Sequence, residues 1–310
     1  MKTLAWVRRG IAALGLAAAT AALCAPALPT TPMTAAANGA RPAMWRISDA
    51  DTTIFLFGTI HVLPNTVGWR TPAFNRVMAR SDGLVVETMI DETPTALAAD
   101  FNRLGVREGL PPFLDRFSPK NRPAIHAAMA QSGVAESRYD QMETWAATLT
   151  LLGRQASSGG FKSSDGVETI LRKNFARAGK PVEQLETNID QMSLFDGLSE
   201  QAQRAMLTEM IGDPGARARS VRGQLDAMVG TWVKGDVTGI ANSFNAELVR
   251  QPELREALLT RRNARWASWI DQRMAKPGSV MVAVGAGHLA GNGSVLQALE
   301  NHGYTITRIQ

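Results

Sequence analysis

The sequence predicts an α/β fold of the α+β kind, with a central mixed β-sheet built from strands near both ends of the chain. Short runs of β-branched and aromatic residues, bounded by glycine, occur near each end and indicate buried strands. Between them, at about residues 93–274, apolar residues recur with the i, i+3, i+4 spacing typical of helices. The sheet is therefore expected to carry a large helical insertion.

Six strands are expected, the first two joined as a hairpin across the acidic turn at 49–51. Pro72 opens the first helix because proline suits the first helical turn. The expected strands occupy residues 44–47, 53–56, 83–87, 181–185, 279–285 and 304–308. The expected helices occupy residues 72–81, 93–104, 119–131, 138–153, 166–178, 188–196, 199–211, 218–233, 236–249, 252–274 and about 293–301.

The first 27 residues indicate a secretory signal peptide. Three basic residues precede an apolar stretch at 11–23, and Ala25-Pro26-Ala27 forms a small-x-small cleavage pattern. Because the apolar stretch is too short to cross a bilayer, we expect a cleaved leader, cut after Ala27 or within 35–37. The protein is accordingly expected to be periplasmic or secreted, with a flexible lead-in over 28–42.

Two other export signals are compatible with the leader. Cys24 permits lipid attachment, although Leu23 directly before it matches that pattern poorly, and Arg8-Arg9 permits twin-arginine export. If cleavage follows Ala27, the mature chain has no cysteine and forms no disulfide.

Residues 43–310 are predicted to form a single domain, and no later apolar run is long enough to span a membrane. The formal charge of the whole chain is +5, and loss of the basic leader reduces it to about +2. Since no dense Lys/Arg face with interleaved aromatic residues occurs, nucleic acid is not an expected partner. The sequence makes no prediction of oligomeric state.

Two predicted strands end in the same way, with Gly-x-x-His. The first motif is Gly58-Thr59-Ile60-His61 and the second is Gly285-Ala286-Gly287-His288. Glycine lets the backbone leave the sheet at a tight angle, so each histidine is expected just past the carboxyl end of a strand. Two of the four histidines of the chain thus share a setting that favours metal binding or acid–base chemistry.

Carboxylates stand at the ends of two other predicted strands: the strand 83–87 ends in Glu87, and Glu186 follows the strand 181–185. If these strand ends meet in one sheet, His61, Glu87 and His288 form a familiar ligand set for a divalent metal with bound water. A second carboxylate, Glu186 or Glu168, could then act as a general base or support a metal ligand. The structural alternative is that the carboxylates cap helices and that the histidines only form hydrogen bonds near a sheet edge.

Arg262 lies in a predicted helix rich in arginine, where it either contributes to a solvated basic face or stabilises an oxyanion. His126 and His302 are expected to be structural or solvated. The tryptophans of the helical region are expected in the core. Gly285–Ala290 fits a loose dinucleotide pattern, but the chain ends too soon for a full βαβ unit.

Several motifs, taken in order, resemble the TraB/PrgY/GumN family, which is related to the Tiki proteins; the GumN-type bacterial branch fits best. The resemblance begins at Leu56–Pro64 and ends at Val284–Gly291, and it covers nearly all of the chain after residue 43. The motifs between them are Val85-Val86-Glu87, Glu143-Thr144-Trp145, Gly166-Val167-Glu168, Ala178–Val182, Leu185-Glu186-Thr187 and Arg262-Asn263-x-x-Trp266.

The resemblance implies a fold of the erythromycin-esterase/ChaN-like kind, with both Gly-x-x-His motifs at one site. Since the Tiki branch is described as metal-dependent proteases, it also implies manganese or cobalt as the ion. His61, Glu87 and His288 match the proposed catalytic or metal positions, and Arg262 matches a family arginine. Glu168 stands where the family often has aspartate.

These observations together predict an exported, metal-dependent hydrolase that acts on a peptide or protein. His61, Glu87 and His288 would hold Mn²⁺, Co²⁺ or Zn²⁺, Arg262 would stabilise the oxyanion and Glu186 would orient a ligand. Two alternatives remain open. The same residues could hold a metal, haem or a peptide without catalysis, or the protein could be an accessory factor in polysaccharide assembly.

Overall fold

The computed structural model describes residues 39–61, 63, 67–89, 94–158, 166–211, 227–249 and 251–310. The predicted signal peptide (1–27) and most of the predicted lead-in (28–42) lie outside these residues. The chain divides into two compact units, here called the sheet unit and the helical unit. The helical unit contains the described residues 94–158 and 187–211, and the sheet unit contains the remainder. The helical region predicted at 93–274 is therefore shared between the two units.

In the described part of the chain, six strands of the sheet unit form one sheet in the order β4-β3-β5-β2-β1-β6. Strands β4, β3, β5 and β2 run parallel, whereas β1 is antiparallel to both of its neighbours. This arrangement confirms the predicted mixed α/β class. The strands are β1 (Met44–Ser48), β2 (Thr52–Thr59), β3 (Gly83–Val86), β4 (Val182–Gln184), β5 (Gly278–Gly285) and β6 (Thr307–Arg308).

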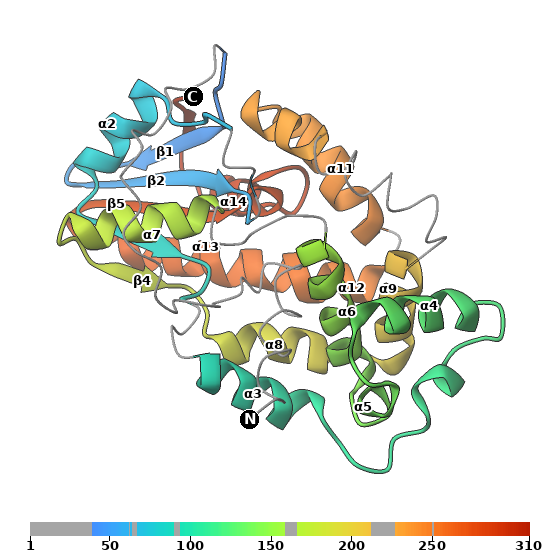
Figure 1. Cartoon of the computed structure of the whole chain (residues 1–310). Coiled ribbons are helices and arrows are strands. Elements are labelled where there is room, and N and C mark those ends of the chain that lie inside the picture. Colours follow the sequence, from blue (N-terminus) through green and yellow to red (C-terminus); the bar gives the residue numbers. More distant parts are fainter. Residues whose placement is uncertain are drawn as a thin grey trace. The chain divides into compact units, whose positions relative to one another are not determined.

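Two apolar layers cover the faces of this sheet, because alternate residues of each strand point to opposite sides. Phe55, Phe57 and Met281 pack on one face with the helices α2, α7 and α11, whereas Leu56 and Val282 pack on the other with α13 and α14. Figure 1 shows α7 and α13 on opposite sides of the strands. The helices of this unit are α2 (Pro72–Arg80), α7 (Val167–Arg177), α11 (Val237–Val249), α12 (Pro252–Arg255), α13 (Arg261–Met274) and α14 (Val295–Asn301), with the short helix η5 (Ala286–Leu289).

The helical unit is built around buried aromatic side chains. Trp145 is fully buried and packs edge-on against Phe101 and nearly parallel to Phe195. Among the described helices of the protein, none is long and apolar enough to cross a membrane. The helices of this unit are α3 (Pro94–Gly105), η2 (Phe113–Arg116), α4 (Arg122–Ser132), α5 (Glu136–Asp140), α6 (Thr144–Ser158), α8 (Asn188–Asp196) and α9 (Glu200–Ile211).

Three predicted elements differ from the structure. The helix expected at 138–153 is broken, because residues 141–143 leave the helix and form backbone hydrogen bonds with 105–107. The helix expected at 252–274 contains a π-helical turn, η4 (Glu256–Thr260), ahead of α13. The strand expected at 304–308 pairs only at Thr307–Arg308. Of the helix expected at 218–233, the described residues 227–233 are helical.

An aromatic cluster secures the segment that leads to the first Gly-x-x-His motif. Phe57 packs against Trp69, Phe74 and Trp232, with ring centroids 4.9–6.3 Å apart. The buried indole nitrogen of Trp232 also donates a 2.8 Å hydrogen bond to the carbonyl oxygen of Gly58. This contact joins the helical residues 227–233 to the end of β2, just before His61.

Trp232→Phe is expected to lower the free energy of unfolding by about 1–3 kcal/mol, because it leaves the buried Gly58 carbonyl without its donor. Chemical denaturation measures this loss. Trp269→Phe is the matched control, since Trp269 is only half-buried. Equal losses in the two variants would contradict a specific role for the Trp232 hydrogen bond.

Candidate functional site

Four parallel strands deliver polar side chains to one edge of the sheet. β2 ends two residues before His61, β3 ends just before Glu87, and β5 leads into η5, which carries His288. Glu186 follows β4, and its backbone N–H donates to the carbonyl oxygen of Glu87 at 2.9 Å. The carboxyl ends of parallel strands are the usual position of a functional site in such sheets.

The two Gly-x-x-His motifs meet because β2 and β5 are adjacent, with Thr59 opposite Gly285. A Cβ atom added at Gly285 would lie 3.0 Å from Glu87 Oε1 and 3.6 Å from both His61 Nε2 and His288 Cδ2. The carboxylate and both imidazoles therefore surround a single glycine, and any side chain at this position would crowd them.

A second glycine allows the motifs themselves to approach. A Cβ atom added at Gly58 would lie 3.1 Å from both the Cα and the Cβ of Ala286, closer than ordinary packing allows. Gly58 and Ala286 thus bring the end of β2 against η5. The glycines of the motif serve this close approach as well as the turn out of the sheet.

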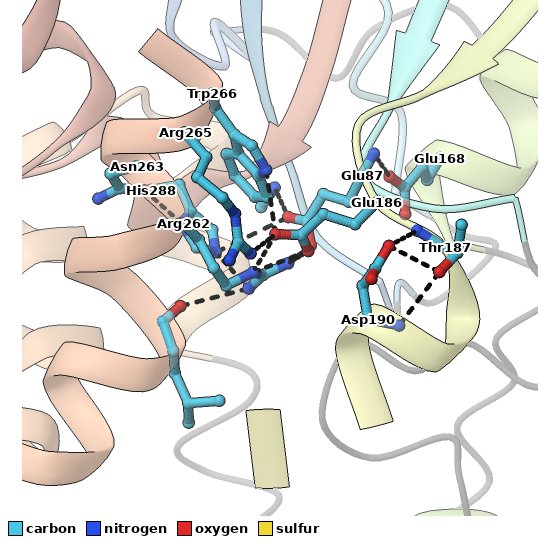
Figure 2. Close-up of polar contacts among 12 residues, drawn as sticks. Glu87, Glu168, Glu186, Thr187, Asp190, Arg262, Asn263, Arg265, Trp266 and His288 are labelled. Atoms are coloured by element: carbon cyan, nitrogen blue, oxygen red, sulfur yellow. Dashed lines mark hydrogen bonds and ion pairs between the residues drawn. The ribbon is translucent and has the colours of Figure 1, made fainter. Parts of the chain in front are cut away.

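The guanidinium of Arg262 lies at the centre of the cluster (Figure 2). Its Nε donates to Glu186 at 2.9 Å, and one terminal nitrogen donates to Glu87 Oε2 at 2.8 Å and lies 2.9 Å from Glu186 Oε2. The other terminal nitrogen lies 3.0 Å from His288 Nε2 and 3.3 Å from the carbonyl oxygen of Leu258. Four of its five N–H donors make hydrogen bonds, and the terminal nitrogen that carries the fifth is within ion-pair distance of Glu186.

This saturation bears on the role predicted for Arg262. Each of its three nitrogens already contacts a carboxylate, an imidazole or a carbonyl, so in this arrangement Arg262 holds other side chains in place, and its role toward an oxyanion stays a prediction. Its side chain is 9% exposed, and its central carbon lies 4.6 Å from the centre of the Trp266 ring, a cation–π contact. The alternative of a solvated basic face does not describe Arg262.

Three residues of one helix, α13, contact Glu186. Besides Arg262, it accepts hydrogen bonds from Arg265 at 2.7 Å and from the indole nitrogen of Trp266 at 3.2 Å (Figure 2). Its carboxylate is therefore fully committed to α13. The sequence predicts that Glu186 orients a ligand, and here it orients Arg262.

His288 is fixed in one tautomer by Asn263. The side-chain nitrogen of Asn263 donates to the Gly293 carbonyl at 2.6 Å, which leaves its oxygen to accept from His288 Nδ1, also at 2.6 Å. Nε2 of His288 is then the acceptor for Arg262. Burial and the Arg262 charge lower the pKa of His288 to about 3, so its imidazole is neutral at physiological pH.

His61 has a different environment. Its Nδ1 lies 3.2 Å from Glu168 Oε2 but makes no hydrogen bond among the described residues, and its Nε2 lies beside Gly285, as does Glu87 Oε1. Burial lowers the pKa of His61, but Glu168 and then Glu87 outweigh it and raise that pKa to about 9. The imidazole is therefore a cation at neutral pH. At 20% exposure, it is also more accessible than Glu87, Glu186 or His288.

Backbone contacts explain why Glu168 reaches His61. The N–H of Val167, at the start of α7, donates to the Ile60 carbonyl at 3.1 Å and places Glu168 beside the first motif. Glu168 Oε1 also accepts from the backbone N–H of Glu87 at 3.3 Å. Glu168 thus joins His61 to the end of β3.

Glu87 is ionised in this environment. Burial opposes its charge, but Arg262, His288, His61 and the Gly285 N–H together hold the pKa of its carboxyl at about 2. That N–H donates to Oε1 at 2.6 Å, while Oε2 accepts from Arg262. Both oxygens are therefore engaged on opposite sides of the carboxylate.

The predicted metal ligands can be tested against these contacts. Nε2 of His288 and Oε2 of Glu87, which could face a shared ion, both bond to Arg262 instead. Among the described residues, no group of three or more His, Cys, Asp or Glu side chains is arranged to hold a metal ion. A site formed by His61, Glu87 and His288 does not fit this arrangement, and Mn²⁺, Co²⁺ or Zn²⁺ stays a prediction.

The sequence did not identify four of the polar partners. Asn263, Arg265 and Trp266 were placed on the expected helix, but their contacts to His288 and Glu186 depend on which face of α13 meets the strand ends. Asn263 and Trp266 also stand in the family-like motif Arg262-Asn263-x-x-Trp266, and the spacing of all three residues from Arg262 (i+1, i+3 and i+4) is a second signal. Thr59 was also missed: its buried hydroxyl has no hydrogen-bond partner in the described residues, at the register position of Gly285.

The other two histidines have surface or structural settings. The side chain of His126, in the helical unit, is 58% exposed. His302 Nδ1 lies 2.7 Å from Asp271, next to the end of α14. Both environments agree with the structural role expected for them.

Glu186→Gln is expected to lower the free energy of unfolding by about 3–5 kcal/mol, because it removes one charge from a buried ion network and leaves Arg262 undercompensated. Chemical denaturation of the variant measures the effect. Glu183→Gln, at an exposed position in β4 just before Glu186, should change stability by less than about 0.5 kcal/mol. A small loss of unfolding free energy in Glu186→Gln would show that the network adds little to the stability of the fold.

Glu168→Gln is expected to bring the pKa of His61 well below 9, because it removes the largest influence that favours the imidazolium. NMR titration of the His61 ring protons measures this pKa directly. The exposed Glu300→Gln should leave the His61 titration unchanged. An unchanged midpoint in Glu168→Gln would mean that the carboxylate does not pair with His61.

Comparison with known proteins places these residues in a family context. A model of the TraB/PrgY/gumN family matches residues 43–308. Two curated relatives, both named "Uncharacterized protein YbaP", come from Escherichia coli (strain K12) and Shigella flexneri. Each is 24% identical over 249 residues, which span 79% of this chain and 86% of the relative. No solved structure matches, so the erythromycin-esterase/ChaN-like comparison stays a prediction.

Proposed function

This chain belongs to the TraB/PrgY/gumN family, and on that premise we propose that it is an exported hydrolase that cleaves amide bonds of a peptide or protein. One observation carries the proposal. His61 has a carboxylate, Glu168, beside one ring nitrogen, while its other ring nitrogen lies beside Gly285, as does a second carboxylate, Glu87. A histidine held in this way is a common proton carrier in hydrolases.

The opposite charges of His61 and Glu87 suit complementary roles in acid–base catalysis. The His61 imidazolium can give a proton to the nitrogen of a scissile amide as the C–N bond breaks. The Glu87 carboxylate can take a proton from the water whose oxygen attacks the carbonyl carbon. Transfer of that proton from Glu87 to His61 restores both groups, and the products are a carboxylic acid and an amine.

The remaining residues of the cluster hold the reacting groups in place and balance their charges. Arg262 and Glu186 hold Glu87 in place from α13, and His288 supplies a neutral acceptor to Arg262. The hydroxyl of Thr59, which has no hydrogen-bond partner among the described residues, lies at the strand end opposite Gly285 and is available to hold a water molecule. These supports keep the reacting groups from reorganising during the reaction.

The cellular location follows the predicted leader. Residues 1–27 carry a basic segment, an apolar stretch and a cleavage pattern, which support transport to the periplasm or beyond. A substrate in that compartment is a peptide, or a protein segment that can reach His61.

The processed, exported chain should cleave at least one member of a peptide library. The assay has separate arms: one after chelator treatment without added metal, and one each with added Mn²⁺, Co²⁺ or Zn²⁺. His61→Ala should lower turnover at least ~100-fold, because it removes the proton carrier. His126→Ala, at an exposed histidine, is the control and should retain turnover.

Two outcomes would contradict this function. Full turnover in His61→Ala would remove His61 from the reaction. Absence of turnover in every arm, together with a haem absorbance band or a retained peptide in native mass spectrometry, would support the alternative of a non-catalytic binding protein.

A further inference from the structure

We propose that the Arg262 guanidinium is the built-in cation of this site, so that Glu87, Glu186 and His288 form a complete site without a divalent metal. The three side chains offer the donor types that metals prefer, two carboxylates and an imidazole. In this protein they turn toward a guanidinium instead. The inference concerns ion binding alone and does not depend on hydrolysis.

The first support is the number of acceptors that face the guanidinium. Glu87, Glu186 and His288 each contact it at 2.8–3.0 Å, and the Leu258 carbonyl receives a further N–H. The planar guanidinium suits several carboxylate oxygens at once, whereas a lysine would be a point charge. Glu87, Glu186 and His288 therefore each already have a donor in Arg262, and none of them needs a metal ion as a partner.

The second support is that the acceptors are themselves held in place. Arg265 and Trp266 fix Glu186, Asn263 fixes His288, and the Gly285 N–H fixes Glu87. Each of these partners lies on α13 or on β5. The acceptors are thus aimed at the guanidinium by the same elements that carry it.

The third support is the cost of moving Arg262 aside. Its side chain is 9% exposed and lies against the Trp266 ring, so it is packed as well as bonded. The Leu258 carbonyl that it reaches belongs to the π-helical turn η4, directly before α13. Entry of a divalent ion between Glu87 and His288 would break these contacts and confine two cations in one buried space.

The same geometry predicts what removal of Arg262 does. Arg262→Ala leaves two buried carboxylates and one imidazole facing a vacated volume, with Arg265 and His61 as the positive groups that remain beside them. Since such a donor set suits a divalent transition ion, the variant should gain a metal site that the natural chain lacks. Arg262→Lys should not gain it, because the ammonium keeps a positive charge there.

Cobalt titration of the chelator-treated full-length chain tests the inference, with visible d–d absorption and the thermal unfolding temperature as readouts. The natural chain should develop no cobalt absorption and no shift in unfolding temperature. Arg262→Ala should develop both at one equivalent of Co²⁺, and adding His288→Ala should abolish them. Arg265→Ala is the matched control, because it removes a more exposed arginine from Glu186 and should bind no cobalt.

Two results would overturn the inference. One is stoichiometric cobalt absorption in the natural chain that disappears in His288→Ala, since Arg262 would then yield its place to a metal. The other is a folded Arg262→Ala protein that binds no cobalt, since the three acceptors would then not suit a cation. If Arg262→Ala does not fold, the natural chain and Arg262→Lys decide the question. Loss of hydrolysis moves none of these readouts, so the proposed function can fail separately.

Discussion

The buried guanidinium of Arg262 is the interaction on which the rest of the site depends. It joins α13 to the ends of three strands, because Glu87 follows β3, Glu186 follows β4 and His288 follows β5. Buried ion pairs repay their desolvation only when geometry is good and every polar atom is satisfied. Here all three guanidinium nitrogens contact acceptors, so the network defines a position for each side chain.

Sheet topology brings these groups together from distant parts of the sequence. β5 inserts between β2 and β3, which places the second Gly-x-x-His motif between the first motif and Glu87. Gly58 and Gly285 then permit contacts that a side chain would block. The repeated glycines therefore have a packing reason that is independent of any chemistry performed at the site.

Much of the fold could be predicted because its signals are local. The apolar run at 279–285 corresponds to β5, and the helix at 188–196 coincides with α8, where Thr187 and Asp190 form a capping box. The break at 141–143 could not be predicted, since it depends on hydrogen bonds to residues 105–107. The π-helical turn at 256–260 has no local signal in the sequence either, since its residues have the same apolar spacing as an α-helix.

The candidate site could be predicted in part. Strand-end positions identified His61, Glu87, Glu186 and His288, since each follows an apolar run, and the Gly-x-x-His repeat marked the pair of histidines. The relations among them depend on the rotation of α13, which sequence spacing does not specify. That rotation turns Arg262 inward, makes Asn263 the partner of His288 and engages the atoms that would otherwise face a metal.

The most direct test of this description is a crystal structure of the natural chain grown with Co²⁺, with anomalous diffraction recorded at the cobalt absorption edge. We expect electron density for the Arg262 guanidinium between Glu87, Glu186 and His288, and no anomalous peak there. A cobalt peak bonded to His288 and Glu87, with Arg262 displaced, would contradict the central role of the guanidinium.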